Sequence, residues 1–289
     1  EEAMATADRV LVVGCALGEQ TTFGWRNGLF APDARVMQAD IDPGVFNQVY
    51  PVNRAVQADA GRLLAALASR ASERKPWFGG RRRPLGPAND PAKGASAAEA
   101  ISAANARLPD DALVSADIGN HRLWVCDGLA ITGPDRLLQS CEFDAMGFSL
   151  PAAIGASIAA PGRKLLSISG DGGFVHTLGE LAVAREHDLP VIAMVFVDGA
   201  LGILRHQAEE MYGQEHFTGL APIDFVQVAG GFGIPARDVA DRAGIDDALD
   251  WAFAQTGPAL VVVRIDPDEV FPPLRSKIEQ RKRDLMGKS

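Results

Sequence analysis

The chain has 289 residues, of which 47% are apolar and 22% are charged, a composition typical of a globular protein with a sizeable core. Its net charge of −9 argues against a nucleic-acid-binding protein, because affinity for phosphate backbones comes from clustered Lys and Arg. There is no apolar run of membrane-spanning length, the N-terminus is acidic, and the three cysteines lack metal-ligand spacing. We therefore expect a cytoplasmic protein with reduced thiols, and neither a nucleic-acid nor a membrane partner.

The first 70 residues predict a small α/β segment. Short apolar and β-branched runs at 9–13, 34–39 and 55–58 predict strands, and residues 61–70 predict a helix. This is about half the usual size of a domain. Because the chain also starts with Glu1 rather than Met, we expect residues 1–70 to be a partial Rossmann-like domain of a longer polypeptide.

Residues 71–97 are polar and rich in Pro and Gly, which predicts a linker. Strand and helix patterns alternate over residues 98–270, and residues 271–289 form a charged tail. The alternation predicts an α/β fold with a doubly wound parallel sheet. The predicted strands are 112–115, 164–169, 191–197 and 259–265, and the predicted helices are 151–160 and 245–256.

Three aspartates directly follow predicted strands. Asp171 and Asp198 are separated by one turn, one helix and one strand, and Asp117 follows an earlier strand. Ligands of open α/β sheets bind beyond the carboxyl ends of the strands, so we expect all three side chains to face one crevice. Two carboxylates there repel each other unless a cation lies between them, and Mg²⁺ binds carboxylates together with phosphate oxygens.

Glycines surround these carboxylates. The sequence Gly170-Asp171-Gly172-Gly173 precedes a helix predicted to begin near Phe174, and Gly199-Ala200-Leu201-Gly202 follows the second aspartate. Their backbone groups could approach a phosphate closely, although Asp171 alone could also cap a helix. The sequence has no Gly-x-Gly-x-x-Gly loop after a strand, which a nicotinamide site requires. It also has no Gly-Lys-Ser/Thr after a glycine loop, which a Walker-type nucleotide site requires. The residues favour a metal-bridged diphosphate.

In several of its sequence motifs, the chain resembles the thiamine-diphosphate enzymes of the acetolactate synthase and 2-oxoacid decarboxylase superfamily. The resemblance rests on four stretches of the second α/β segment and two of the first, and it covers nearly the whole chain. These stretches are Gly170-Asp171-Gly172, Val197-Asp198-Gly199, residues 117–124, residues 146–153, residues 11–18 and residues 39–43. The resemblance implies that residues 1–70 are the second half of a central domain and that residues 98–270 are the diphosphate-binding domain.

The resemblance also assigns roles to single residues. Asp171, Asp198 and the carbonyl of Ala200 match Mg²⁺ ligands, although many members have Asn in place of Asp198. Asn120 and His121 match side chains that reach the diphosphate, and Met146 matches the residue that bends the cofactor. The cofactor-binding set expected from residues and resemblance together is Asn120, His121, Met146, Gly170, Asp171, Gly172, Gly173, Asp198, Ala200, Leu201 and Gly202.

The chain departs from the family pattern at positions that affect which cofactors and which catalytic residues we expect. Asp144 stands where a small residue usually meets the pyrimidine, and Ala16 and Gln20 stand where flavin-binding members tend to have arginines, so we do not expect FAD. The glutamate that activates the cofactor belongs, in this superfamily, to a preceding pyrimidine-binding domain. We expect that domain to be absent from residues 1–289 and therefore assign no catalytic residue here.

The resemblance implies a thiamine-diphosphate- and Mg²⁺-dependent 2-oxoacid decarboxylase or carboligase, acetolactate-synthase-like, with a pyruvate-type donor. We expect a homo-oligomer or a complex with a chain that carries the pyrimidine domain. The alternative is a catalytically silent cofactor-binding fragment or interaction module. A nucleotide-dependent oxidoreductase is a third and weaker hypothesis.

Overall fold

The computed structural model describes residues 2–19, 21–22, 24–73, 89–131, 133, 135–141 and 143–286. Parts of the predicted linker and tail (74–88 and 287–289), together with Gln20 and Glu142, lie outside these residues. The chain divides into two compact units, Glu1–Arg83 and Pro84–Ser289. None of the helices in the described ranges combines the length and hydrophobicity that a membrane span requires.

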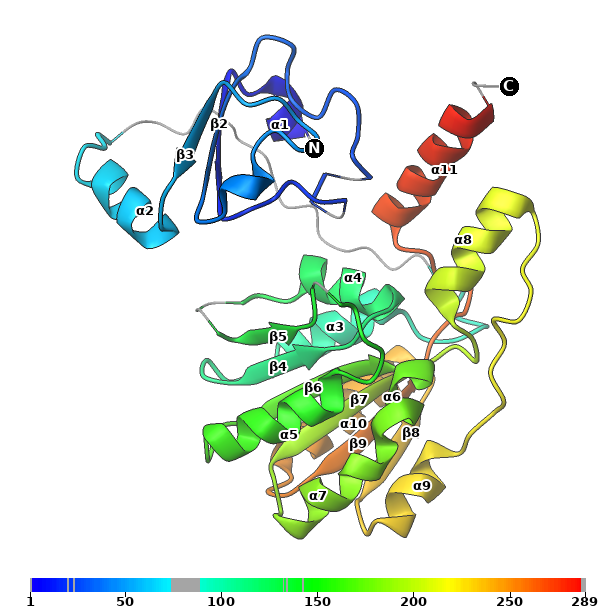
Figure 1. The fold of residues 1–289 in the computed structure, drawn as a ribbon. Helices are drawn as coiled ribbons and strands as arrows, with labels where there is room; N and C mark the ends of the chain where they lie inside the picture. Colours follow the sequence, from blue (N-terminus) through cyan, green and yellow to red (C-terminus); the bar gives the residue numbers. More distant parts are fainter. Residues whose placement is uncertain are drawn as a thin grey trace. The chain divides into compact units, whose positions relative to one another are not determined.

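Unit 1 contains a small parallel sheet (Figure 1), as the alternating pattern of its sequence predicts. Its strands are hydrogen-bonded in the order β1-β2-β3. Asp59 follows β3 and caps the N-terminus of α2, because its side chain accepts a hydrogen bond from the amide of Arg62. The elements are α1 (Glu2–Thr6), β1 (Arg9–Val13), β2 (Arg35–Asp40), the 3₁₀ helix η1 (Pro43–Val45), β3 (Arg54–Gln57) and α2 (Ala60–Ala68).

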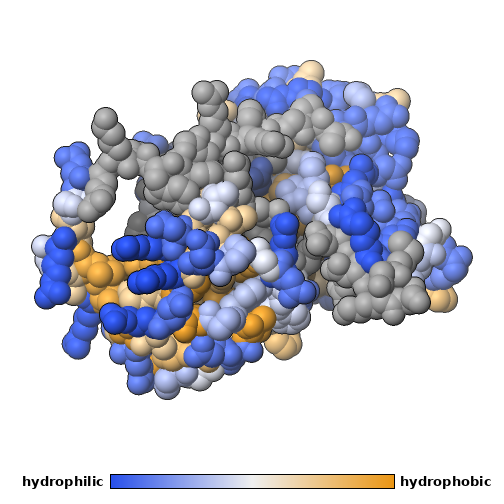
Figure 2. Space-filling view, turned by 90° about the horizontal axis from the view of Figure 1, so that it is seen from above, coloured by the Kyte–Doolittle hydropathy of each residue, from blue (hydrophilic) through white to orange (hydrophobic). Residues whose placement is uncertain are grey.

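The core of unit 1 is small. Val12, Leu17 and Val36 form its buried cluster, whereas α2 has no buried residue despite its leucines. Ile41 is 71% exposed and Leu64 is 49% exposed. Figure 2 likewise shows orange, hydrophobic residues at the surface of the molecule, bordered by blue, hydrophilic ones.

Unit 2 is a six-stranded parallel sheet covered by helices on both faces (Figure 1), which confirms the predicted doubly wound α/β fold. Its elements are α3 (Ala97–Asn105), β4 (Leu113–Ala116), α4 (Asn120–Gly128), β5 (Leu137–Gln139), α5 (Ser149–Ala159), β6 (Leu165–Gly170), α6 (Asp171–Thr177), the 3₁₀ helix η2 (Leu178–Glu180), α7 (Leu181–Glu186), β7 (Val191–Val197), α8 (Gly202–Tyr212), α9 (Phe225–Gly231), β8 (Ala236–Val239), α10 (Arg242–Ala254), β9 (Ala259–Arg264) and α11 (Pro272–Met286).

Alternate residues of the central strands pack on opposite faces of this sheet. Leu166, Ile168 and Met194 belong to a cluster with α3, α4 and α10, whereas Leu165 and Val195 belong to a cluster with α5, α7 and α9. This alternation follows from the two-residue period of a strand. Both faces are therefore covered, and β6 and β7 read as continuous apolar runs.

The strand order β5-β4-β6-β7-β9-β8 reverses direction between β4 and β6. The chain passes from β4 to β5 on one side and then returns to place β6 on the other side of β4. Helices of successive crossovers diverge at such a point and leave a crevice beyond the strand ends. In the neighbouring pair, Gly170 is in register with Phe196, so the residues that follow β6 and β7 lie at the same level.

Helix α6 begins at Asp171 rather than near Phe174. Phe174 is buried and makes an edge-to-face contact with Phe225 of α9, and this packing outweighs the low helix propensity of Gly172 and Gly173. At the other end of the chain, the charged segment after residue 271 forms α11, in which Leu274 and Ile278 are buried.

Candidate functional site

A cavity of about 220 Å³ lies at the carboxyl ends of β4, β6 and β7. All of the residues predicted for the cofactor site line this cavity. A larger cavity of about 700 Å³ adjoins it, and the two share the lining residues Met146, Asp171, Gly172, Asp198, Leu201 and Ile265. The topology thus brings together residues that are distant in sequence, at the switch point where an α/β sheet binds its ligands.

Asp171 is the first residue of α6 and is buried. Its Oδ1 accepts a hydrogen bond of 2.8 Å from the amide of Gly172, and its Oδ2 accepts one of 2.9 Å from the amide of Gly199. Burial raises the pKa of Asp171, and these hydrogen bonds partly oppose that effect. The Gly172 amide thus donates to Asp171 in this structure.

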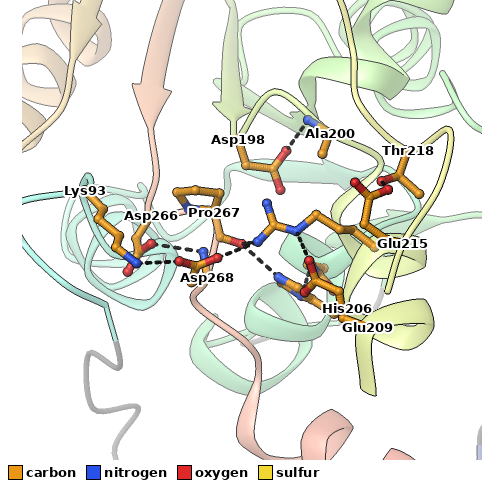
Figure 3. Close-up of polar contacts among 12 residues, drawn as sticks. Lys93, Asp198, Ala200, His206, Glu209, Glu215, Thr218, Asp266, Pro267 and Asp268 are labelled. Carbon is orange, nitrogen blue, oxygen red and sulfur yellow. Dashed lines mark hydrogen bonds and ion pairs between the residues drawn. The ribbon is translucent and has the colours of Figure 1, made fainter. Parts of the chain in front are cut away.

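Asp198 follows β7 and accepts a hydrogen bond of 3.1 Å from the amide of Ala200 (Figure 3). Burial, followed by the charge of Asp171, raises the pKa of Asp198 to about 6. The two carboxylates therefore repel each other at the cavity, and a cation between them would remove that cost. Within the described ranges, no group of three or more His, Cys, Asp or Glu residues could hold a metal ion. A cation here would need backbone or ligand oxygens in addition to the two carboxylates.

Asn120 and His121 open helix α4 beyond the end of β4. Asn120 Oδ1 and His121 Nε2 are both buried and have no hydrogen-bond partner among the described residues. Burial lowers the pKa of His121 to about 4, so the imidazole is neutral near pH 7. Buried polar atoms without partners are rare in folded proteins, and two such atoms on one cavity wall indicate a polar ligand.

Glycines keep the cavity and its surroundings free of side chains. A Cβ atom at Gly202 would lie 2.3 Å from Asp198 Oδ2 and 3.1 Å from Asn120 Nδ2, and one at Gly172 would lie 2.9 Å from Leu201 Cδ2. A Cβ at either position would require the neighbouring side chain to shift, Asp198 at Gly202 and Leu201 at Gly172. Gly170 likewise lies against the His121 ring, where a Cβ would be 3.4 Å from Nδ1.

Two backbone hydrogen bonds hold the remaining wall of the cavity in place. Leu201 donates to the carbonyl of Thr218, and Leu220 donates to the carbonyl of Gly199, at 2.8 Å each. Ala200, whose carbonyl was predicted to ligate a metal, lies between these two links and is buried. The segment from Gly199 to Gly202 is thus fixed on both sides.

Asp117 does not face the crevice, and this expectation is wrong. It is 1% exposed and accepts hydrogen bonds from the amides of Ile118, Gly147 and Phe148. These contacts fix the loop that carries Met146, which is 39% exposed and lines both cavities. A Cβ at Gly173 would lie 2.3 Å from Asp117 Oδ2, so Gly173 makes room for this carboxylate.

Two residues that contact the cavity wall were not predicted from the sequence. Arg122 is buried and pairs with Asp144 at 2.5 Å, so the unusual carboxylate of the cavity wall has a counter-charge. His206 is 2% exposed and lies 3.1 Å, Nδ1 to Nδ2, from Asn120. The one sequence signal for His206 is its spacing of three residues from Ile203, an apolar residue of the same helix that lines the cavity.

Together these features fit a diphosphate held through a divalent cation. The cavity offers two repelling carboxylates, two unpartnered polar atoms and a floor of glycines. Carboxylates and a carbonyl suit Mg²⁺, whose remaining positions phosphate oxygens and water usually occupy.

Comparison with known proteins agrees with this geometry. Residues 117–263 match the family model described as "Thiamine pyrophosphate enzyme, C-terminal TPP binding domain". Residues 1–67 match the model described as "Thiamine pyrophosphate enzyme, central domain". Together the two models account for both α/β segments.

Individual relatives are of the same kind. The large subunit of acetolactate synthase isozyme 1 of Escherichia coli (strain K12) is 32% identical over 92% of this chain and 49% of its own length. The large subunit of isozyme 2 of the same organism is 30% identical over 94% of the chain and 50% of its own length. Pyruvate oxidase of Lactiplantibacillus plantarum is 30% identical over 96% of the chain and 48% of its own length. The chain thus spans about half the length of these curated relatives.

Proposed function

The chain belongs to the family of thiamine pyrophosphate enzymes, and on this premise we propose that it is the diphosphate-binding part of a Mg²⁺-dependent, acetolactate-synthase-like decarboxylase or carboligase. The observation that carries the proposal is the pair of carboxylates at neighbouring strand ends, where burial and then the charge of Asp171 raise the pKa of Asp198. This pair is costly without a cation. A pyruvate-type 2-oxoacid is the proposed donor substrate.

In this proposal Asp171, Asp198 and the Ala200 carbonyl hold Mg²⁺. His121 presents its buried Nε2 to the diphosphate side of the cavity, and Met146 lies between the two cavities as the support for the cofactor. Gly172 and Gly202 line the cavity and bring their backbone close to the space proposed for the phosphates. Asp117 contributes indirectly, because it fixes the loop that carries Met146.

Thiamine diphosphate, when bound, would supply the electron sink that 2-oxoacid decarboxylation requires. The residues of this chain bind and orient that group, and none of them is proposed as its activating acid. We propose that a pyrimidine-binding domain provides the activating glutamate, from a further segment or from another chain. The relatives support this, since each is about twice as long as the stretch that matches.

Calorimetry with thiamine diphosphate tests the site. We expect binding in the presence of Mg²⁺ and its loss in EDTA, and we expect Asp171→Ala to weaken Mg²⁺-dependent binding by about 100-fold or more, since even changes to groups that merely orient metal ligands cost 10- to 100-fold. Glu180→Ala is the matched control, because it removes one carboxylate from an exposed turn outside both cavities. Unchanged binding by Asp171→Ala would contradict the metal assignment.

A pyruvate-consumption assay tests the proposal that turnover needs a pyrimidine-binding domain. The 289-residue chain with thiamine diphosphate and Mg²⁺ should consume no pyruvate above background, and addition of a pyrimidine-binding domain should restore turnover. Turnover by the chain alone would show that it holds its own activating group.

A further inference from the structure

Two cysteines of unit 2 contact the same glutamine side chain. Cys126 belongs to α4, Cys141 follows the edge strand β5 (Figure 1), and both are exposed. The sulfur of Cys126 lies 3.8 Å from Oε1 of Gln139, and the sulfur of Cys141 lies 3.9 Å from the same atom. The sum of these two distances, about 7.7 Å, is the upper limit of the separation between the two sulfur atoms.

Further contacts hold the two elements together. Arg122 precedes Cys126 by four residues and therefore lies on the same face of α4. Its guanidinium donates to the carbonyl of Ser140 at 3.1 Å and to the carboxylate of Asp144 at 2.5 Å. The amide nitrogen of Gln139 also donates to the sulfur of Cys126, at 3.4 Å. The segment that follows β5 is thus held on the face of α4 that carries Cys126.

The same two elements form part of the wall of the smaller cavity. Helix α4 begins at Asn120, and its first two residues line this cavity. Asp144 and Met146, which follow Cys141 in the chain, line it as well. Neither Cys126 nor Cys141 lines the cavity itself. A change at the two sulfur atoms would therefore reach the cavity through the positions of α4 and of the segment after β5.

We propose that Cys126 and Cys141 are a reversible thiol pair, in which exchange with a small-molecule disulfide such as oxidised glutathione joins the two sulfur atoms and clamps the segment after β5 onto α4. Thiol–disulfide exchange requires access to the sulfur atoms, and both thiols are exposed. The effect of the clamp on ligand binding rests on the proposed function, because it acts on the cavity that we assign to thiamine diphosphate.

The bond forms in two exchange steps. The thiolate of one cysteine attacks a sulfur of the small-molecule disulfide, which releases one small thiol and leaves a mixed disulfide on the protein. The thiolate of the other cysteine then attacks the protein sulfur of this mixed disulfide and releases the second small thiol. Each cysteine gives up one proton and one electron, and the small-molecule disulfide is reduced to two thiols.

The clamp changes the chain in two ways. It closes a loop between positions 126 and 141, which are 15 residues apart, and a closed loop restricts the unfolded state. It also fixes two parts of the cavity wall relative to each other, so a ligand that contacts both parts has less motion to restrain when it binds. Before the sulfur atoms can meet at the bond length of about 2.05 Å, the half-buried amide of Gln139 has to turn away from them.

Peptide mapping of the full chain, equilibrated with a series of ratios of oxidised to reduced glutathione, tests the thiol pair. We expect a bond between Cys126 and Cys141 of one chain, formed at a rate that does not depend on protein concentration and lost in dithiothreitol. The oxidised chain should have a midpoint of thermal unfolding about 5 °C or more above that of the reduced chain. Absence of the bond at every ratio, or a bond between two chains in its place, would overturn the thiol pair.

Cys15→Ser is the matched control, because Cys15 belongs to unit 1 and its sulfur contacts the amide of Leu17 at 3.4 Å. This variant should keep both the bond and the thermal shift. Cys126→Ser and Cys141→Ser should lose both under oxidant and, because the two side chains are exposed, should unfold at the midpoint of the reduced chain. A thermal shift that persists in either variant would overturn the assignment to this pair.

The rate at which thiamine diphosphate leaves the Mg²⁺-loaded chain tests the clamp. We expect release from the oxidised chain to be about fivefold slower than from the reduced chain, because differences in affinity at one site are mostly differences in release rate. Cys141→Ser should release the ligand equally fast under both conditions. Equal or faster release from the fully cross-linked chain would overturn the clamp. If the unmodified chain binds no thiamine diphosphate with Mg²⁺, the proposed function fails, whereas peptide mapping and thermal unfolding still decide the thiol pair.

Discussion

The ends of β4, β6 and β7 each carry an aspartate, and the three carboxylates have different surroundings. Asp117 accepts hydrogen bonds from three backbone amides, Asp171 from two and Asp198 from one, within the part of the chain that the structure describes. A carboxylate can accept about four, so the unused capacity increases from β4 to β7. The cavity lies beside Asp171 and Asp198, while Asp117 does not line it.

The comparison shows what separates a structural aspartate from a ligand-binding one at a strand end. All three carboxylates have a raised pKa with burial as the largest cause, but the charge of Asp171 contributes only to the shift of Asp198. Burial alone therefore does not distinguish a structural aspartate from a ligand-binding one. The number of amides that reach the carboxylate, and the presence of a second carboxylate, distinguish the two kinds.

Substitution of Asp117 is expected to have the largest effect on the free energy of unfolding. We expect Asp117→Ala to lower the free energy of unfolding by about 4 kcal/mol, because three amides lose a charged acceptor inside the protein, and urea denaturation would measure it. Asp117→Asn should lose about half as much, since its amide oxygen can still accept. If Asp117→Ala left the free energy of unfolding nearly unchanged, the distinction between the strand ends would be wrong.

His121 is a basic group in the wall of the same cavity, and its burial makes the stability of the chain depend on pH. Its folded pKa is about 4, whereas the unfolded chain has the ordinary value near 6.5. Between these two pH values the unfolded state binds the proton more readily, so stability is complete above pH 6.5 and declines as the pH falls toward 4, by up to about 3 kcal/mol.

Stability against pH, compared between the ligand-free chain and His121→Gln, would measure this effect. The variant should lack the part of the acid dependence that His121 contributes, while both proteins keep the part that comes from their carboxylates. Parallel curves would mean that His121 is not buried as a neutral ring.

Asp198 should respond in the opposite direction to Asp117. We expect Asp198→Asn to raise the stability of the ligand-free chain by about 1 kcal/mol, because it removes a charge that burial and Asp171 disfavour. The same variant should lose most of its Mg²⁺ affinity. Thermal unfolding with and without Mg²⁺ and thiamine diphosphate measures both effects, and a loss of stability in the ligand-free chain would contradict the repulsion between the two carboxylates.

The sequence predicts the features that depend on neighbouring residues. The apolar run at 191–197 is enough to predict β7, and Asp171 and Asp198 are recognisable because each directly follows a buried strand. The start of α6 was misplaced because Gly172 and Gly173 read as a turn, whereas the contact of Phe174 with Phe225 fixes the helix from outside its own sequence.

The roles that local sequence patterns do not predict depend on contacts between distant segments. Asp117 is a structural residue because Gly147 and Phe148 approach it from a loop about 30 residues later. His206 reaches Asn120 across 86 positions of sequence, and neither residue type at either position indicates the pairing. Local patterns therefore identify which groups gather at the strand ends but not how each one is satisfied.

Two further aspartates follow β9 and can be compared with those after β4, β6 and β7. A substitution there is expected to have the smallest effect on stability. Asp266 resembles Asp117, since it is 3% exposed and accepts from the amides of Asp90 and Asp268. Asp268 is 54% exposed and pairs with Lys93, which is 49% exposed. Exposed ion pairs contribute little to stability because water and salt screen them.

We therefore expect Lys93→Met to shift the midpoint of thermal unfolding by less than about 1 °C, and Asp266→Asn, which changes a buried acceptor of two amides, to shift it by several times as much. Calorimetric scans at low and high salt would measure both variants. A large shift in Lys93→Met that disappears at high salt would mean that an exposed strand-end carboxylate matters as much as a buried one, and the comparison between the strand ends would then have to be redrawn.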